Sequence, residues 1–225
     1  SISFFSFCSW LFSSSMMSSF SLLVKMPSFG NICGVQEHVM NKNKSAANIL
    51  KKGLYIIATP IGNLNDLSQR AISVLNEVDF IICENPKHSI KLLNKLGIKK
   101  KLISLHDYNE EAVINKISKY QHNSKIGLIS DAGSPLISDP GYKLIKDFIS
   151  KNIMITSIPG PSSLIASLQV SGLPLNKFAF YGFVSKNKKE RKVFIEEMII
   201  SKLTSVFFVS GKHLEDLVND IVELL

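Results

Sequence analysis

From Gly53 onward, short apolar runs alternate with segments in which apolar residues recur every three or four positions. The short runs are typical of strands buried on both faces of a sheet, and the periodic segments are typical of amphipathic helices. The predicted strands are Leu54–Ala58, Phe80–Cys83, Leu102–Leu105, Ile126–Ser130 and Ile153–Ile158. The predicted helices are one that starts near Leu67 with Asn65 or Asp66 as its cap, then Ser89–Leu96, Glu110–Tyr120, Tyr142–Ser150 and Ser162–Val170. This order predicts an α/β domain with a mostly parallel sheet over residues 40–173.

The pattern changes after Pro174. Two further strands are predicted at Phe178–Phe183 and Ser205–Val209, with a basic run between them and an amphipathic helix at His213–Leu225. We interpret residues 174–225 as part of a second α/β domain. Since so few elements cannot bury a sheet on both faces, we expect this domain to be truncated.

The first 39 residues differ from the rest of the chain. Ser1–Val24 is apolar, but serines interrupt every apolar cluster, so no stretch reaches the roughly 20 residues that cross a bilayer. We therefore predict no membrane association. We expect residues 1–39 to be a disordered or spurious leader.

The charge is unevenly distributed. Lys and Arg number 26 against 18 Asp and Glu, which gives a net charge of +8, and Lys25 and Glu37 cancel within the first 39 residues. A basic body favours polyanionic partners such as RNA, although a lysine-rich composition alone has the same effect on charge. The three cysteines and five histidines show no metal-ligand spacing. We expect no metal site and a reducing cytoplasm.

Three loops rich in glycine and proline follow predicted strands. They are Thr59–Leu64, Ser130–Gly141 and Ile158–Ser163. Ligands bind beyond the carboxyl ends of strands in open α/β sheets, so the three loops predict a ligand site at one sheet edge. A structural reading stays open for each loop, because Asp139 before Pro140 also suits the start of a helix. None of the loops is a dinucleotide fingerprint or a lysine-containing phosphate loop.

These segments resemble the signature segments of the tetrapyrrole methylase superfamily. Within it the chain is most similar to the branch that methylates a cytidine 2′-hydroxyl of 16S ribosomal RNA. Support for that branch comes from Cys83–His88, His106–Glu110 and Gly172–Pro174, and the resemblance covers Gly53 to the last residue.

The resemblance implies a two-domain tetrapyrrole-methylase-like fold that binds S-adenosyl-L-methionine in a cleft between the domains. It implies a homodimer that acts on 16S rRNA of the small ribosomal subunit without a metal. The residues that would hold the cofactor are Pro60, Gly62, Asp131, Ala132, Gly133, Ser134, Pro159, Gly160 and Ser162.

A group near the ribose hydroxyl is needed to accept its proton. The candidate catalytic residues are Glu84, His88, His106 and Asp107. The alternative reading is that Glu84 and Asp107 cap helices and that His106 is a hydrogen-bonded loop residue. The candidate RNA-binding residues are Lys87, Lys186, Lys188, Lys189, Arg191 and Lys192, although such charge runs are often only solvated helix faces.

The chain departs from the family pattern in two places. Asn85, Pro86 and Lys87 stand where the family usually has an acidic residue, threonine and arginine. Val209 and His213 stand where it usually has glutamate and arginine. The resemblance as a whole predicts rRNA cytidine 2′-O-methylation as the function. The alternatives are a corrin or porphyrin methylase and an inactive truncated fragment.

Overall fold

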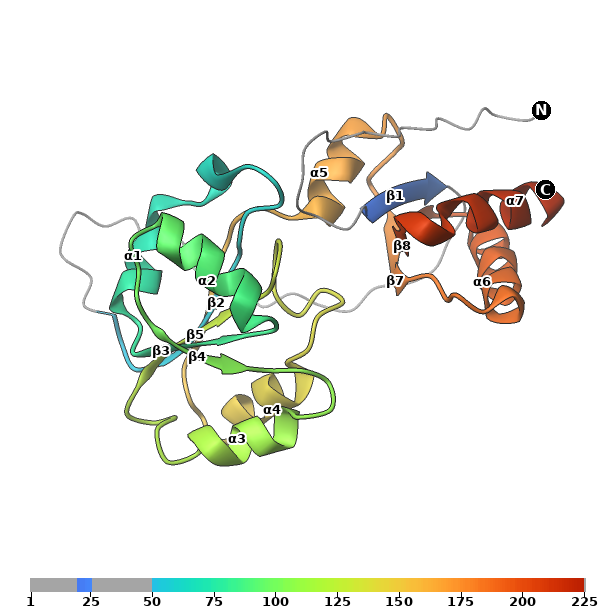
Figure 1. The fold of residues 1–225 in the computed structure, drawn as a ribbon. Helices are drawn as coiled ribbons and strands as arrows, with labels where there is room; N and C mark the ends of the chain where they lie inside the picture. Colours follow the sequence, from blue (N-terminus) through green and yellow to red (C-terminus); the bar gives the residue numbers. More distant parts are fainter. Residues whose placement is uncertain (1–19, 26–49, 225) are drawn as a thin grey trace. The chain divides into compact units, whose positions relative to one another are not determined.

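The computed structural model describes residues 50–224, together with the backbone of residues 20–25 (Figure 1). By its internal contacts the chain divides into two compact units. One unit is Met40–Ser163, and the other comprises Leu164–Leu225 and Ser1–Val39. The sequence predicts the division ten residues later, after residue 173. The contacts instead group the helix that follows Ser163 with the second unit.

The first unit is built on a five-stranded parallel sheet. Its strands lie in the order β4-β3-β5-β2-β6, and every neighbouring pair is parallel. Their bounds are β2 Gly53–Ile57, β3 Phe80–Cys83, β4 Lys101–Ser104, β5 Lys125–Ile129 and β6 Ile155–Ile158. The predicted α/β fold with a mostly parallel sheet is confirmed.

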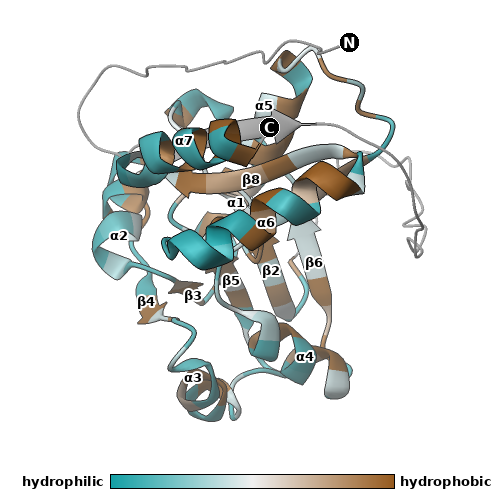
Figure 2. Ribbon diagram, turned by 90° about the vertical axis from the view of Figure 1, so that its right-hand side faces the viewer, coloured by the Kyte–Doolittle hydropathy of each residue, from teal (hydrophilic) through white to brown (hydrophobic). Residues whose placement is uncertain are grey.

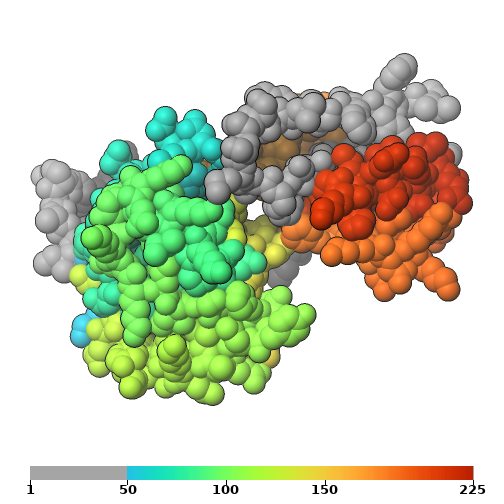
Figure 3. Space-filling view, in the orientation of Figure 1, coloured from blue at the N-terminus to red at the C-terminus, as the bar shows by residue number. Residues whose placement is uncertain are grey.

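Helices cover both faces of this sheet (Figure 1). They are α1 Gln69–Glu77 and α2 Pro86–Lys95 on one face, and α3 Glu110–Ile117 and α4 Tyr142–Ser150 on the other. Alternate strand residues enter opposite cores, as Ile81 packs with α1 and α2 while Phe80 and Ile82 pack with α3 and α4. Both faces are apolar, which explains why the strands read as continuous apolar runs. In Figure 3, residues from about 50 to 163 form one closely packed body.

The second unit contains a three-stranded sheet in the order β1-β8-β7. Strand β1 pairs antiparallel with β8, and β7 pairs parallel with β8. The elements are β1 Phe20–Lys25, α5 Ser163–Val170, β7 Phe178–Phe183, α6 Lys188–Ser201, β8 Thr204–Ser210 and α7 Leu214–Leu224. Buried residues of α6, α7 and β8 form a core of their own. In Figure 2, β8 is largely hydrophobic while α6 and α7 carry both colours, as amphipathic helices do.

Most predicted elements exist with shifted ends, and Phe80–Cys83, Tyr142–Ser150 and Phe178–Phe183 have the predicted bounds. One local prediction is wrong. Helix α1 is capped by Ser68, whose Oγ accepts a hydrogen bond from the Ala71 N–H at 3.1 Å, and not by Asn65 or Asp66. The basic run continues into a 14-residue helix, α6, for which the sequence analysis gives no bounds.

The predicted leader lies mostly outside the described residues. Within it only Phe20–Lys25 is described, as the strand β1. Among the described residues no helix is long and apolar enough to span a bilayer.

Candidate functional site

The first two glycine–proline loops are joined by their backbones. They follow β2 and β5, which are neighbouring strands. The Thr59 N–H donates to Gly133 O at 2.8 Å, and the Gly133 N–H donates to Thr59 O at 3.0 Å. The buried Thr59 hydroxyl also donates to Ser130 O at 3.2 Å. These bonds hold the two loops together at the carboxyl edge of the sheet.

The third loop, after β6, joins the other two. Ser134 Oγ donates to Pro161 O at 3.3 Å. A Cβ placed on Gly160 would lie 3.0 Å from Ala58 Cβ, so Gly160 permits the close approach of this loop to the end of β2. The predicted gathering of the three loops at one sheet edge is confirmed.

Two glycines give these loops their backbone shape. Gly133 has φ +81°, and a Cβ there would lie 3.3 Å from Ile61 Cγ2. Gly62 has φ +148°, and a Cβ there would meet no atom within 4 Å. A ligand can therefore approach the backbone at Gly62, while side chains crowd Gly133.

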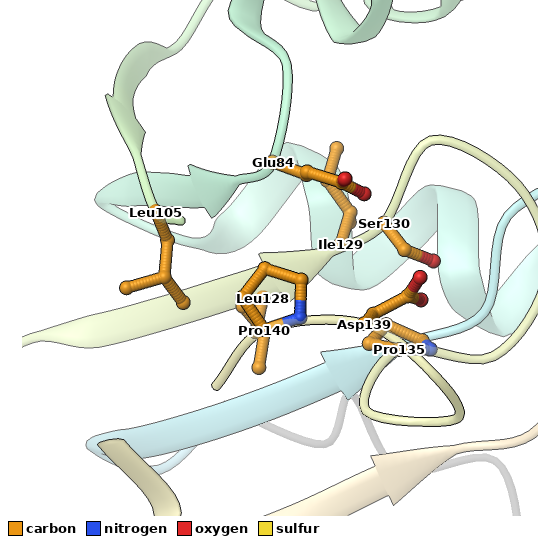
Figure 4. Close-up of a pocket in the computed structure, with 8 residues that line it drawn as sticks. All are labelled: Glu84, Leu105, Leu128, Ile129, Ser130, Pro135, Asp139 and Pro140. Atoms are coloured by element: carbon orange, nitrogen blue, oxygen red, sulfur yellow. The ribbon is translucent and has the colours of Figure 1, made fainter. Parts of the chain in front are cut away.

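Carboxylates gather beside these loops. Glu84 follows β3, and Asp131 and Asp139 lie on the loop after β5. A small pocket at this place, which we call the carboxylate pocket, is lined by Glu84, Leu105, Leu128, Ile129, Ser130, Pro135, Asp139 and Pro140. Figure 4 shows the carboxyl groups of Glu84 and Asp139 and the hydroxyl of Ser130 turned toward one space.

Burial and mutual repulsion shift these carboxyl groups toward the neutral form. Burial raises the pKa of Asp139 to about 6, and the charge on Glu84 adds to the shift while a hydrogen bond with Ser130 opposes it. Burial also raises the pKa of Glu84, with a further increase from the negative charge of Asp131. Such displaced titrations are typical of sites that move protons.

Asp131 lies against the turn between β3 and α2. Burial raises the pKa of its carboxyl, and the opposing influences are the nearby His88 and a hydrogen bond from the Asn85 backbone. Its Oδ1 atom is buried and accepts no hydrogen bond from the described residues. A buried carboxylate oxygen without a donor is costly, which makes it a suitable contact for a ligand's N–H or O–H group.

The turn between β4 and α3 carries the other two catalytic candidates. The Ser104 hydroxyl lies 3.2 Å from Glu84 O, to which it donates, and 2.8 Å from His106 Nε2. The charges of His106 and Asp107 both act on the Glu84 carboxyl. The structure thus brings Glu84, His106 and Asp107 close together. His88 lies near Asp131, and the charge of Asp131 also acts on Glu84.

The structural alternatives for the acidic candidates are not observed. Asn85 caps α2, with Oδ1 accepting from the Lys87 and His88 N–H groups, so Glu84 is not the cap. Asn109 occupies the N-cap position of α3, so Asp107 is not the cap.

Asp139 is not a helix cap either. Helix α4 has Gly141 at its N-cap position, and the buried Glu110 accepts from the Gly141 and Leu144 N–H groups at 3.1 Å each. Asp139 is thus a member of the carboxylate pocket. Sequence reasoning missed it because the Asp-Pro pair resembled a helix start.

A family model described as "Tetrapyrrole (Corrin/Porphyrin) Methylases" matches residues 53–225. The chain belongs to this family. The predicted family resemblance is confirmed, and the three joined loops are the segments on which that resemblance was based.

Several similar proteins are named "Ribosomal RNA small subunit methyltransferase I". That of Halalkalibacterium halodurans is 41% identical over 176 residues, which cover 78% of this chain and 61% of that protein. That of Escherichia coli O157:H7 is 39% identical, and the alignment covers 83% of this chain and 65% of that protein. That of Rickettsia prowazekii is 44% identical, with 74% of this chain and 60% of that protein aligned. The chain thus spans less than two thirds of the length of these relatives.

Solved structures share the fold. The crystal structure of a diphthine synthase gives a TM-score of 0.59 at 16% identity, and the alignment covers 76% of this chain and 72% of the diphthine synthase chain. A conserved hypothetical protein from Aeropyrum pernix K1 gives 0.56 at 11% identity, with coverage of 70% and 57%. At these identities the likeness concerns the fold alone.

The residues that we expected to depart from the family pattern have local explanations. Asn85 and Pro86 form the cap and first residue of α2, a favourable helix start. Val209 is buried in the core of the second unit, where an apolar side chain packs well. His213 Nδ1 lies 3.6 Å from Asp216 Oδ2.

The basic run on α6 is only partly available to a partner. Arg191 is buried, with Nε 2.6 Å from Asp220 Oδ2 and Nη1 donating to Lys186 O at 3.1 Å. Lys188 pairs with Asp220 at 3.5 Å, and Lys192 pairs with Glu223 at 2.6 Å. RNA contact through these three residues would compete with ion pairs inside the unit. Lys186 and Lys189, like Lys87 of the first unit, are exposed and make no ion pair among the described residues.

Within residues 50–224 no group of His, Cys, Asp or Glu is placed to hold a metal ion.

Proposed function

We propose that this protein uses S-adenosyl-L-methionine to methylate the 2′-hydroxyl of a cytidine in 16S rRNA. The observation that carries the proposal is the joining of the three loops beside Glu84 and Asp131. The names of relatives at 39–44% identity support the reaction and the substrate class. A homodimer acting in the cytoplasm on the small ribosomal subunit remains a prediction.

The loops suit this cofactor. Its hydroxyl and ammonium groups are donors of the kind that the unpartnered Asp131 Oδ1 needs, and Gly62 leaves its backbone open to a ligand. The residues that would hold it are Pro60, Gly62, Asp131, Ala132, Gly133, Ser134, Pro159, Gly160 and Ser162. The cofactor supplies a methyl group on a positively charged sulfur, which is already activated for transfer.

The protein's own task is to orient the ribose hydroxyl and to accept its proton. Glu84 suits the second task, because it is partly buried and its raised pKa makes it a stronger base than an exposed glutamate. His106 and Asp107 act on the Glu84 carboxyl with opposite signs, the first lowering and the second raising its pKa. We therefore assign Glu84 as the proton acceptor, tuned by the turn after β4.

Calorimetry with S-adenosyl-L-methionine tests the site, and transfer of a labelled methyl group to unmodified small-subunit rRNA tests the reaction. Binding heat together with label in rRNA supports the proposal. Label transferred to a porphyrin or corrin but not to rRNA would assign the alternative substrate. If no binding heat is measured, the chain is an inactive fragment.

A further inference from the structure

The side chain of Tyr108 stands entirely in solvent. Its relative exposure is 101%, the highest among the exposed large apolar side chains of the described residues, whereas Tyr120 is 44% exposed. The residue lies between β4 and α3, two positions after His106. A ring in this state adds nothing to the packing of the core, and its whole face is open to contact with a partner.

The turn that carries Tyr108 is rigidly held. The Asn109 side chain spans it, with Oδ1 accepting from the His106 N–H at 2.7 Å and Nδ2 donating to Ser104 O at 3.2 Å. The Asn109 N–H also donates to His106 O at 3.0 Å. On the C-terminal side, the buried Glu110 is fixed by two hydrogen bonds from the start of α4. The backbone of Tyr108 is therefore fixed while its ring remains free to make contacts.

The turn borders the proposed site for proton transfer. Ser104 Oγ connects it to the backbone of Glu84. His106 and Asp107, which lie between Ser104 and Tyr108 in the sequence, act on the Glu84 carboxyl. A substrate whose hydroxyl reaches Glu84 must therefore pass close to this turn.

We propose that Tyr108 stacks on an unpaired base of the RNA and so positions the ribose hydroxyl at Glu84. This inference rests on the proposed function and adds a substrate-binding residue to it. Proteins read single-stranded RNA by stacking splayed bases on aromatic side chains, and a fixed backbone limits the entropy lost when the ring binds. The ligand class is a single-stranded ribonucleotide segment, held through the face of one base.

The test compares Tyr108→Ala, Tyr108→Phe and the control Tyr120→Ala, each in the full chain. Binding of a fluorescently labelled, cytidine-containing single-stranded RNA is measured by anisotropy, and binding of S-adenosyl-L-methionine by calorimetry. Tyr108→Ala should weaken RNA binding roughly 5- to 100-fold, and Tyr108→Phe should stay within about twofold of the wild type because it keeps the ring. Tyr120→Ala should bind RNA normally, and none of the variants should change cofactor binding.

Several results would overturn the inference. One is a Tyr108→Ala protein with wild-type affinity for RNA, and another is a Phe variant as weak as the Ala variant, which would assign the contact to the hydroxyl. A wild-type chain that binds no RNA also overturns it. Failure of the proposed function looks different. In that case RNA binding depends on the ring, but no methyl group reaches rRNA. If methyl transfer occurs and Tyr108→Ala leaves its KM unchanged, only the stacking inference fails.

Discussion

Thr59 and Gly133 exchange both of their backbone hydrogen bonds, at 2.8 and 3.0 Å, although 74 residues separate them. This antiparallel bridge joins the loops after two parallel strands, β2 and β5. Because only backbone atoms make this bridge, the geometry of the proposed cofactor site depends on the backbone conformation of the two loops more than on any one side chain. Conformation at Gly133 is then the sensitive point.

Gly133→Val should abolish binding of S-adenosyl-L-methionine while leaving the fold largely intact. Valine is strained at φ +81°, by about 1–2 kcal/mol, and its Cβ would start only 3.3 Å from Ile61 Cγ2. Calorimetry measures the binding, and circular dichroism checks the fold. Gly97→Val is the matched control, since Gly97 also has positive φ but its Cβ would meet no atom within 4 Å. Normal binding by Gly133→Val would show that the loop assignment is wrong.

Asp139→Asn should stabilise the protein at neutral pH. The pKa of Asp139 is about 6 in the folded state against an ordinary value of 3.8, so the fold favours the neutral carboxyl. Its contribution is fully present below about pH 4 and is lost as the pH rises to about 6. At pH 7 the variant should gain about 1–2 kcal/mol, allowing for solvent screening, and it should gain almost nothing at pH 4.

Urea denaturation at the two pH values measures this difference in the free energy of unfolding. Asp107→Asn is the control, because that side chain is exposed and should give little change at either pH. Equal stability of Asp139→Asn and the wild type at pH 7 would contradict the account of the carboxylate pocket.

Arg191→Met should destabilise the second unit by about 3–5 kcal/mol, because it leaves the Asp220 carboxylate buried without its partner. The double variant Arg191→Met/Asp220→Leu should recover much of the loss, since no unpaired charge remains. Lys188→Ala, which removes a mostly exposed partner of the same carboxylate, should cost about 1 kcal/mol or less. Denaturation midpoints measure all three, and equal losses for Arg191→Met and Lys188→Ala would refute a structural role for Arg191.

Lys189→Ala should reduce the salt dependence of RNA binding. If the exposed Lys189 contacts one phosphate, the slope of log K against log salt concentration should fall by about 0.7. Lys192→Ala is the control, because its ammonium group already pairs with Glu223 at 2.6 Å. Anisotropy titrations at several salt concentrations give the slopes. The same slope for Lys189→Ala and the wild type would remove this helix from the RNA-binding surface.

The sequence predicted the elements of the first unit well because both cores impose simple patterns. Alternate residues such as Phe80 and Ile81 enter opposite cores, so the strands appear as unbroken apolar runs bounded by glycine and proline. The site loops could also be predicted, since parallel strands must end at one edge.

Interactions between distant residues could not be predicted. The Arg191–Asp220 pair joins positions 29 residues apart, and nothing in the local pattern distinguishes Arg191 from the exposed lysines beside it. Glu110 caps a helix that begins 32 residues later, so the Asp139-Pro140 pair appeared to be the cap. Burial of Asp139 became visible only when the ends of β3 and β5 were brought together.

Glu110 has a wider effect on the site. Its two carboxylate oxygens bind the Gly141 and Leu144 N–H groups, so the turn that displays Tyr108 and the loop that contains Asp139 are fastened to each other through one side chain. This turn and this loop therefore keep a fixed position relative to each other before any ligand binds. In the proposed function, RNA and the methyl donor would therefore bind to a framework that is set during folding, with little reorganisation left for binding.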